Sequence, residues 1–410
     1  MASTGRVIIV GGGLAAARAA GAAREAGFDG ELALVAGEPL LPHERPPLSK
    51  GYLQGSDAAD AIFPHDAAWY AEHDVDVRTG SEAVGLDTDA RELTLASGDR
   101  LGYRRLLLAT GARARRFAGD GADLDGVHHL RTLAESTALR DAISGGDRRV
   151  VVVGAGWIGL EVAAAARTYG NEVTVLGHGD VPLAREIGPQ LGEVFAGLHR
   201  EHGVDLRMGA DVTALRGDGA VSAVVLGSRE EVPADVVVFG IGAVPNVELA
   251  ASAGLTVDDG IVVDAHLSAS APGVFAAGDV ASVFSPTVGT HLRVAHWGNA
   301  DASGTAAGRA LAGERVTYDE IPYFFTDQYD LGMEYSGYAS LAGGAELVVR
   351  GDLPGREFLA FRVADDRVVA GMNVNVWDVN EQVQRLIRSG APVDPAALAD
   401  PDVPLEAIGA

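Results

Sequence analysis

Residues 150–166 read VVVVGAGWIGLEVAAAA, an apolar run followed by a glycine turn and a stretch rich in alanine. This order predicts a buried strand, a tight turn and a helix. The first glycine of such a turn permits the bend, the second lets backbone amides approach a pyrophosphate, and the third keeps the helix close to the strand. All three positions are glycine here: Gly154, Gly156 and Gly159. With a further strand predicted at Glu172–Leu176, the stretch is typical of a dinucleotide-binding βαβ unit.

The N-terminus repeats this plan, because residues 5–21 read GRVIIVGGGLAAARAAG. The positions that correspond to the three glycines are Gly11, Gly13 and Ala16. Glu38 follows the predicted second strand, where a carboxylate can accept hydrogen bonds from ribose hydroxyls. A glycine turn without a ligand is the alternative, but strand, helix and acid are all in place. Two such units predict two dinucleotide-binding domains in one chain.

The residues that follow the predicted strand Glu172–Leu176 do not decide whether this βαβ unit binds NADH or NADPH. A carboxylate at that position favours NAD, because it accepts the hydroxyls of an unphosphorylated ribose. The chain instead has Gly177 and His178, with no acid before Asp180. No arginine marks a 2′-phosphate site; a protonated His178 can help to bind such a phosphate, and a solvated loop histidine is the alternative. NADH and NADPH both stay candidates.

Composition limits the classes of partner. At 410 residues, of which 47% are hydrophobic, the chain is expected to form two or three globular domains. No apolar run is long enough to cross a bilayer, which favours a cytoplasmic location. The net charge of −25 disfavours nucleic acid and anionic membranes as partners, because both would be repelled.

The chain contains no cysteine. Disulfides, cysteine-ligated clusters, thiolate nucleophiles and redox-active cysteine pairs are therefore excluded. Any redox chemistry must be carried by a bound organic cofactor, and no metal site is predicted.

The region from Ile321 changes character. VVRG, EFLAFRV and RVVAGMNVNV read as strands, and LPGR at 353–356 and ADDR at 364–367 read as turns between them. This pattern predicts an antiparallel sheet. The tail after Gly390 is rich in Pro and Asp and is predicted to be an extended or short helical surface segment.

Five segments together resemble one family. They are RPPLSK (Arg45–Lys50), LLLATGA (Leu106–Ala112), GAGWIGLEVA (Gly154–Ala163), GIGAVPN (Gly240–Asn246) and VFAAGDVA (Val274–Ala281). The chain resembles the FAD-dependent pyridine nucleotide reductases, specifically the ferredoxin reductases of bacterial oxygenase systems, of the putidaredoxin reductase and biphenyl dioxygenase reductase types. The resemblance covers nearly the whole chain.

The resemblance implies an α/β fold with two Rossmann-like domains and a C-terminal α+β domain with an antiparallel sheet. The FAD-binding domain is implied to be discontinuous, with the NAD(P)-binding domain inserted between its parts. The implied segments are 1–113 and 243–317 for FAD, 114–242 for NAD(P)H, and 318–410 for the C-terminal interface domain.

The resemblance also implies the site residues. Lys50 and Glu161 are implied to form a catalytic ion pair beside flavin N5, where a cation stabilises the negative charge of the reduced ring. A surface lysine and a solvent-facing helical glutamate are the alternatives. Asp279 is implied to hold the ribityl chain, with a helix N-cap as a compatible second role. The other implied cofactor-binding residues are Arg45, Thr110, Gly111, Gly242, Gly278 and Trp297, beside the two glycine turns, Glu38 and Lys50.

The aromatic residues leave two points open. Trp297, in HWGNA, is interpreted as a flavin neighbour or as a core tryptophan. Relatives often carry tryptophan before DQYD, whereas this chain has Phe324 and Phe325. A role that needs an indole N–H is therefore in question there.

A [2Fe–2S] ferredoxin is the implied partner, and through it a haem or non-haem oxygenase. Arg309 and Arg315 form a hypothetical docking patch for an acidic ferredoxin, with solvated arginines as the alternative. A monodehydroascorbate- or quinone-type reductase and an apoptosis-inducing-factor-like regulatory flavoprotein are the alternative functions, since neither needs cysteine. The particular ferredoxin and the choice between monomer and homodimer stay open.

Overall fold

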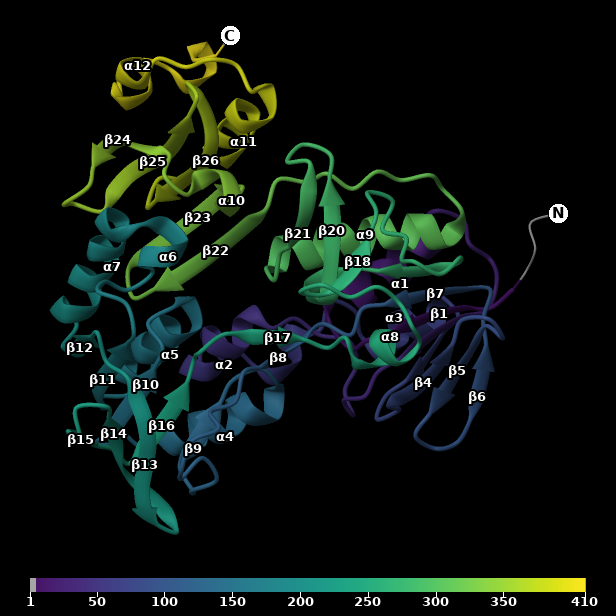
Figure 1. Ribbon diagram of the computed structural model, residues 1–410, viewed down its shortest axis with the longest axis horizontal. Helices are drawn as coiled ribbons and strands as arrows, with labels where there is room; N and C mark the ends of the chain where they lie inside the picture. The colour runs from purple at the N-terminus through teal and green to yellow at the C-terminus, as the bar shows by residue number, and fades with distance from the viewer. Residues whose placement is uncertain (1–4, 410) are drawn as a thin grey trace. The chain divides into compact units, whose positions relative to one another are not determined.

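The computed structural model describes residues 5–409 and divides into two compact units, each assembled from three segments of the chain (Figure 1). The first unit takes the described residues of Met1–Pro46, with Ala59–Arg113 and Ala243–Pro322. The second takes Pro47–Ala58 and Ala114–Gly242, with the described residues of Tyr323–Ala410. The four-segment domain division stays a prediction. Among residues 5–409, no helix is both long and apolar enough to cross a membrane.

The first unit is built on a parallel five-stranded sheet in the order β19-β7-β1-β2-β3. Every residue of β1 (Val7–Val10) and β2 (Leu32–Val35) is buried, as expected of a parallel sheet covered on both faces. The remaining strands of the sheet are β3 (Val75–Arg78), β7 (Arg105–Leu108) and β19 (Val274–Ala276). β1 lies between β2 and β7, in the middle of the sheet.

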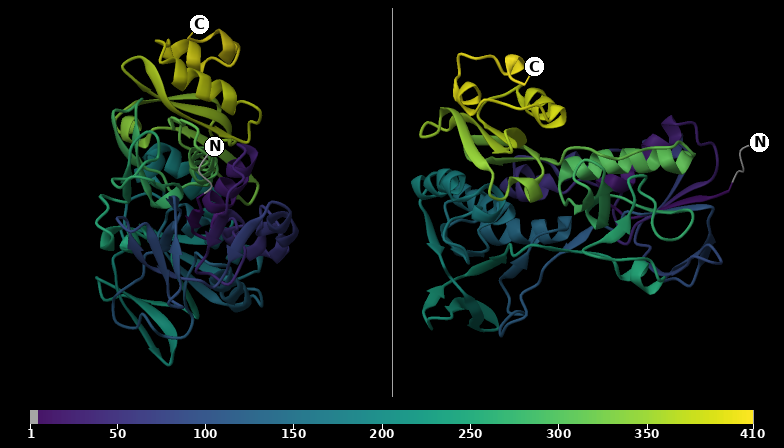
Figure 2. Two further views of the ribbon diagram at one scale, coloured as in Figure 1. Left: turned by 90° about the vertical axis from the view of Figure 1, so that its right-hand side faces the viewer. Right: turned by 45° about the horizontal axis from the view of Figure 1, so that its top comes forward.

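Two long helices of this unit pack closely together. α1 (Leu14–Glu25) follows β1, and α9 (Trp297–Ala312) lies along it in Figures 1 and 2. A Cβ atom on Gly304 of α9 would lie 2.5 Å from the backbone oxygen of Ala15. Glycine at this position therefore lets the two helix backbones approach each other.

Smaller elements complete the first unit. A three-stranded antiparallel sheet has the order β4-β5-β6, and a mixed one has the order β18-β20-β21. The strands are β4 (Ala83–Asp87), β5 (Glu92–Leu95), β6 (Arg100–Gly102), β8 (Ala112–Ala114), β17 (Ala243–Pro245), β18 (Ile261–Val263), β20 (Ala281–Ser285) and β21 (Thr290–Arg293). The short helices are η2 (Ala59–Ile62), α3 (Ala67–Glu72), α8 (Glu248–Ser252) and η3 (Gly278–Val280), and η1 (Pro46–Ser49) begins at the end of the first segment.

The second unit contains another parallel five-stranded sheet, in the order β12-β11-β10-β16-β9. Its strands are β9 (Val127–His129), β10 (Arg149–Val153), β11 (Glu172–Gly177), β12 (Val204–Met208) and β16 (Val236–Phe239). Its helices are α2 (Gly51–Gln54), α4 (Leu133–Ile143), α5 (Trp157–Thr168), α6 (Ala184–Ile187) and α7 (Pro189–Glu201). An antiparallel sheet of β13 (Val212–Asp218), β14 (Ala220–Leu226) and β15 (Glu231–Pro233) adjoins it.

The C-terminal part of the second unit is a five-stranded antiparallel sheet in the order β22-β23-β26-β25-β24. The strands are β22 (Tyr323–Gln328), β23 (Leu331–Gly337), β24 (Glu346–Asp352), β25 (Glu357–Ala364) and β26 (Arg367–Val374). The predicted turns at 353–356 and 364–367 join β24 to β25 and β25 to β26. The remaining helices are α10 (Ala339–Ala342), α11 (Asn380–Ser389), α12 (Pro395–Ala399) and η4 (Leu405–Ala407). The predicted α/β fold class with a C-terminal antiparallel sheet is confirmed.

Candidate active site

The first glycine turn joins β1 to α1. Gly11 has a φ of 151°, and a Cβ atom on it would lie 2.1 Å from the backbone oxygen of Ala109, so the fold itself requires glycine there. Gly13 differs, because a Cβ on it would meet no atom of residues 5–409 within 4 Å beyond its own immediate surroundings in the chain. Ala16 is fully buried in α1. The open space over Gly13, at a helix N-terminus, fits the approach of a pyrophosphate.

The second turn, between β10 and α5, has the same construction. A Cβ on Gly154 would lie 2.3 Å from the oxygen of Gly240, and a Cβ on Gly159 would lie 2.0 Å from the oxygen of Gly154. A Cβ on Gly156 would again have open space around it, with no neighbour within 4 Å in the part of the chain that the structure describes. Both turns thus leave bare backbone where a dinucleotide phosphate would lie, so the residues present fit FAD and NAD(P)H.

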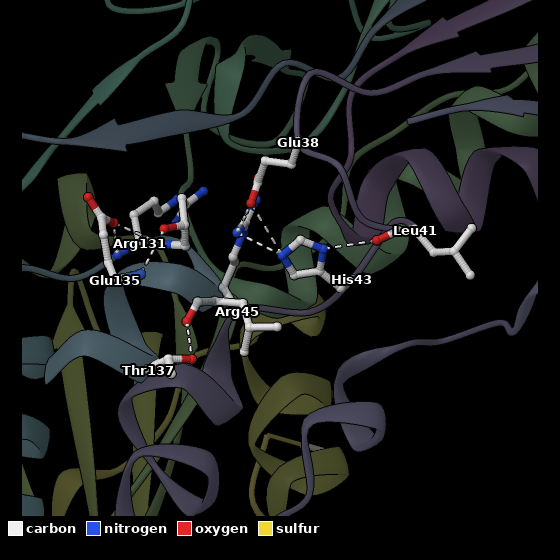
Figure 3. Close-up of polar contacts among 9 residues, drawn as sticks. Glu38, Leu41, His43, Arg45, Arg131, Glu135 and Thr137 are labelled. Carbon is white, nitrogen blue, oxygen red and sulfur yellow. Dashed lines mark hydrogen bonds and ion pairs between the residues drawn. The ribbon is translucent and has the colours of Figure 1, made fainter. Parts of the chain in front are cut away.

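Glu38 lies beyond the carboxyl end of β2 and is paired with Arg45 (Figure 3). One guanidinium nitrogen contacts Glu38 Oε1, and the other lies 3.4 Å from Oε2 and 2.9 Å from Nε2 of His43. Arginine can only donate, so His43 Nε2 accepts; its Nδ1 therefore carries the proton and donates to the oxygen of Leu41 at 3.0 Å. His43 is fully buried. It positions Arg45 and hence Glu38, a role that sequence reasoning missed.

Three predicted cofactor residues lie at the points where the chain leaves and re-enters the first unit. The hydroxyl of Thr110 donates to the backbone oxygen of Asn246 at 2.7 Å, and the Asn246 amide donates back to the oxygen of Thr110 at 2.8 Å. Gly111 and Gly242 have φ values of 64° and 100°, which favour glycine. Among the described residues, no neighbour lies within 4 Å of a Cβ placed on Gly242.

Gly278 and Asp279 form the short helix η3 after β19. The N–H of Gly278 donates to the hydroxyl of Ser303 at 2.9 Å. The N-cap position of η3 belongs to Ala277, so Asp279 is in the first turn and does not cap this helix. Burial lowers the pKa of His296, and the charge of Asp279 opposes that shift.

Trp297 is the first residue of α9. Its indole Nε1 donates to Oε2 of Glu44 at 3.1 Å. The side chain is half-buried, which is compatible with a place beside an aromatic ligand and equally with core packing. Its predicted role as a flavin neighbour stays a prediction.

Lys50 and Glu161 form an ion pair in the second unit, with side-chain exposures of 14% and 5%. Glu161 Oε1 also accepts from the hydroxyl of Thr326 at 2.6 Å, and Oε2 accepts from the hydroxyl of Ser49 at 2.5 Å. Lys50 Nζ lies 5.6 Å from the ring centroid of Phe325. The structure brings the two predicted catalytic residues together and adds Ser49 and Thr326, which sequence reasoning missed.

Burying such a pair costs several kcal/mol for each ion, so ion pairs like this one are weak evidence for stability. Hydrogen bonds to both carboxylate oxygens of Glu161 offset part of that cost. A nearly buried ammonium with this support is more typical of a functional site. Neither a surface lysine nor a solvent-facing helical glutamate agrees with the low exposure of these two side chains.

Phe324 and Phe325 occupy different surroundings on β22. Phe324 packs against Trp157, at the start of α5, and against Tyr335, with centroid distances of 5.1 Å to each. Phe325 faces Lys50. The aromatic surface thus persists without an indole N–H at either position.

Gly177 ends β11 and is buried. A Cβ on it would lie 2.5 Å from Cε of Met208 and 2.9 Å from Cβ of Ala155. Met208 therefore covers the place from which an acidic side chain would project. His178, next in the chain, is exposed.

Of the two arginines considered for docking, Arg309 has an acidic partner. Its Nε lies 2.7 Å from Oε2 of Glu314, and its side chain is more than half exposed. This pairing reduces the positive charge that Arg309 can offer to an acidic protein, and the patch of Arg309 and Arg315 stays a hypothesis.

The family profile described as pyridine nucleotide-disulphide oxidoreductase matches residues 5–304. The chain belongs to this family. A second profile, described as reductase C-terminal, matches residues 323–409. The family assignment agrees with the two glycine turns, and the second profile covers the antiparallel sheet.

Several similar proteins are ferredoxin reductases by name. The ferredoxin–NAD(+) reductase component of the anthranilate 1,2-dioxygenase system of Burkholderia cepacia is 40% identical and covers 97% of this chain and 98% of its own. Putidaredoxin reductase of Pseudomonas putida is 35% identical and covers 100% of this chain and 97% of its own. The predicted resemblance is confirmed.

Solved structures agree with these relatives. The structure of the covalent putidaredoxin reductase–putidaredoxin complex matches with a TM-score of 0.94 and 34% identity, covering 98% of this chain and 97% of that one. The ferredoxin reductase for the CYP199A2 system of Rhodopseudomonas palustris gives the same TM-score and identity, covering 98% of each chain.

Proposed function

We propose that this chain is an FAD-dependent NAD(P)H:ferredoxin oxidoreductase that supplies a [2Fe–2S] ferredoxin serving an oxygenase. The observation that carries the proposal is the nearly buried Lys50–Glu161 pair of a cysteine-free chain, in which Glu161 lies on α5, the helix that follows the second glycine turn. Relatives of 40% and 35% identity over almost their full length are named as reductases of such systems.

The two glycine turns would hold the cofactors. Gly11, Gly13 and Glu38 are assigned to FAD, and Gly154 and Gly156 to the pyrophosphate of NAD(P)H. FAD held there would supply the change from a two-electron hydride donor to one-electron delivery. The protein supplies the binding, the orientation and the charges around this exchange.

Lys50 makes the main electrostatic contribution to the proposed reaction. Its ammonium stabilises the negative charge that the cofactor acquires on reduction, and Glu161 holds that ammonium in place. Ser49 and Thr326 donate to the carboxylate of Glu161, so it keeps a fixed position. No side chain has to act as a nucleophile or as a general base.

The family description includes disulphide chemistry, but this chain cannot carry out thiol reactions because it has no cysteine. Electrons must therefore pass from the cofactor to an external acceptor without a protein disulfide between them. This requirement suits a one-electron carrier such as a ferredoxin. We place the reaction in the cytoplasm, where the reduced nicotinamide coenzymes that it consumes are regenerated.

The test is the reduction of cytochrome c by NADH or NADPH, with and without a [2Fe–2S] ferredoxin. We expect reduction that depends on the ferredoxin and saturates with it. Fast reduction of quinones or of monodehydroascorbate, with no stimulation by several ferredoxins, would overturn the proposal in favour of those reductase types. Slow cofactor reduction by both coenzymes would favour a regulatory flavoprotein.

A further inference from the structure

Buried polar side chains form a continuous row from α7 to Glu161, all within the second unit. His199 Nε2 lies 2.8 Å from Oε1 of Gln328, and Gln328 Nε2 lies 3.1 Å from the hydroxyl of Thr326. That hydroxyl lies 2.6 Å from Glu161 Oε1. The exposures of His199, Gln328 and Thr326 are 0%, 0% and 1%. Beyond Thr326, nothing in the proposed reaction accounts for these groups.

The Glu161 carboxylate at the end of the row determines which group donates in each of its hydrogen bonds. A carboxylate only accepts, so the single hydroxyl proton of Thr326 points to Glu161. The Thr326 oxygen must then accept from the amide nitrogen of Gln328, which turns the amide oxygen toward His199. His199 Nε2 must therefore carry a proton. All the donors point toward Glu161, so their dipoles act in the same direction on its negative charge.

The protonation state of His199 is fixed by its surroundings. Its Nδ1 is buried and has no hydrogen-bond partner among the described residues, so a second proton there would be an unpaired buried charge. Burial accordingly lowers the pKa of His199 to about 4. The neutral ring with its proton on Nε2 is the form that completes the row.

A purely structural tie between α7 and the β22–β23 hairpin does not need these groups. His202, the C-cap residue that follows α7, already stacks on Tyr329 of the hairpin turn, with ring centroids 3.7 Å apart. Apolar side chains from α7 and the C-terminal sheet also share one core, which includes Leu198, Phe358 and Met333. Apolar residues of similar volume would serve packing equally well at positions 199 and 328.

We propose that His199, Gln328 and Thr326 are positioning residues that hold the carboxylate of Glu161, and through it the ammonium of Lys50, in the geometry needed for hydride transfer. This inference rests on the proposed function, because it assumes that Lys50 stabilises the reduced cofactor. It assigns a task to α7 and to the end of β22 that no local motif indicates. Thr326 acts directly on the carboxylate, and His199 acts through Gln328.

The test compares two matched pairs of variants, Thr326→Val with Thr326→Ser and His199→Leu with His199→Gln. Ser keeps the hydroxyl, and Gln keeps an N–H donor near the place of Nε2. Leu198→Ala is the control, because Leu198 is a buried α7 residue outside the row. In the FAD-loaded proteins we measure the rate of cofactor reduction by NADH in single turnovers and the midpoint potential of the bound FAD.

We expect Thr326→Val to slow cofactor reduction about tenfold and to lower the potential by about 30 mV, the two-electron equivalent of a tenfold change in the equilibrium constant. His199→Leu should show a smaller change of the same kind. Thr326→Ser and His199→Gln should restore both values to within about twofold, and Leu198→Ala should reduce thermal stability alone.

The inference would be overturned if the two variants of each pair had the same rate of cofactor reduction and the same midpoint potential. It would also be overturned if the changes in these two values were no larger than in Leu198→Ala. If His199→Leu does not fold, the Thr326 pair decides on the same criteria. Delivery of electrons to ferredoxin is scored separately in the wild type. A protein that fails there but shows the paired changes in potential contradicts the proposed partner and keeps the positioning role.

Discussion

At the residue scale, Lys50 is the side chain on which the proposed chemistry depends most. Replacing it with Met keeps most of the apolar stem and removes the charge. We expect the rate of cofactor reduction by NADH to fall about a hundredfold, the usual cost of removing one preorganised group that stabilises developing charge. Single-turnover absorbance of the FAD measures this rate.

Lys50→Arg is the control for charge alone, and we expect it to recover part of the rate. Glu161 would still have Ser49 and Thr326 as partners in every Lys50 variant, so its position should change little. A Lys50→Met protein that is reduced at the wild-type rate would remove Lys50 from the mechanism.

Gly177 determines a second expectation at this scale. The chain has no carboxylate there to bind the ribose of NADH or to repel the 2′-phosphate of NADPH, and Met208 covers the position. We therefore expect the ratio of kcat/KM for the two coenzymes to lie within about tenfold, or about 1.4 kcal/mol. Steady-state kinetics with both coenzymes measures the ratio. A ratio of kcat/KM above a hundredfold would mean that other residues recognise the 2′-position of the coenzyme ribose.

His199 predicts a loss of stability in acid. Its folded pKa of about 4 lies below the ordinary value of 6.5, so the unfolded chain binds the additional proton between these pH values. Its contribution to stability is therefore complete above about pH 6.5 and is lost as the pH falls toward 4, by about 2 kcal/mol at pH 5. Urea unfolding at pH 7.5 and pH 5 should show a smaller loss for His199→Gln than for the wild type. Equal losses in both proteins would contradict the assignment of a neutral buried ring.

At the element scale, the first glycine turn contains one glycine that folding requires, Gly11, and one that the proposed cofactor binding requires, Gly13. Gly13→Ala adds a methyl group into open space, without a clash with any described residue, so the free energy of unfolding of the apo-protein should fall by less than about 1 kcal/mol. The same methyl group lies where a pyrophosphate would approach, so FAD affinity should fall at least tenfold. Gly11→Ala should instead prevent folding, because of its contact with Ala109.

Thermal melts of the apo-proteins and FAD titrations measure both effects. Gly156→Ala is the matched variant in the second turn, and it should raise the KM for NAD(P)H while FAD stays bound. Unchanged FAD affinity in Gly13→Ala would mean that the first turn does not hold the cofactor.

Local signals explain why so much of the fold could be predicted. Each βαβ unit depends on residues close together in the sequence, as in Gly154, Gly156 and Gly159, and the hairpins at 353–356 and 364–367 carry their own turn residues. The row from His199 could not be predicted in this way. His199 and Gln328 are 129 residues apart, and neither belongs to a motif that indicates the other.

The candidate site can be predicted from the sequence only as far as the family motifs extend. Those motifs indicate Lys50 and Glu161, and the structure adds the hydroxyls of Ser49 and Thr326 that donate to Glu161. Asp279 shows the opposite case, since the N-cap interpretation fails because η3 begins at Gly278, two residues earlier than that role requires. His43 was missed because burial, and not residue type, gives it its role.

At the scale of the whole molecule, the same βαβ plan is used twice, once in each unit, and the C-terminal sheet joins the second. Each unit has its own turn for a dinucleotide, while the ion pair and the row that leads to it belong to the second. The absence of cysteine means that the cofactor alone converts a two-electron donor to one-electron delivery.

The most direct test of that conversion is its electron balance. The FAD-loaded protein is reduced anaerobically with one equivalent of NADH and mixed with excess oxidised [2Fe–2S] ferredoxin, while the absorbance of both is followed. We expect the FAD to be fully reoxidised and two equivalents of ferredoxin to be reduced for each NADH, because a hydride carries two electrons. FAD that stays reduced beside oxidised ferredoxin would show that this protein does not deliver electrons to a ferredoxin.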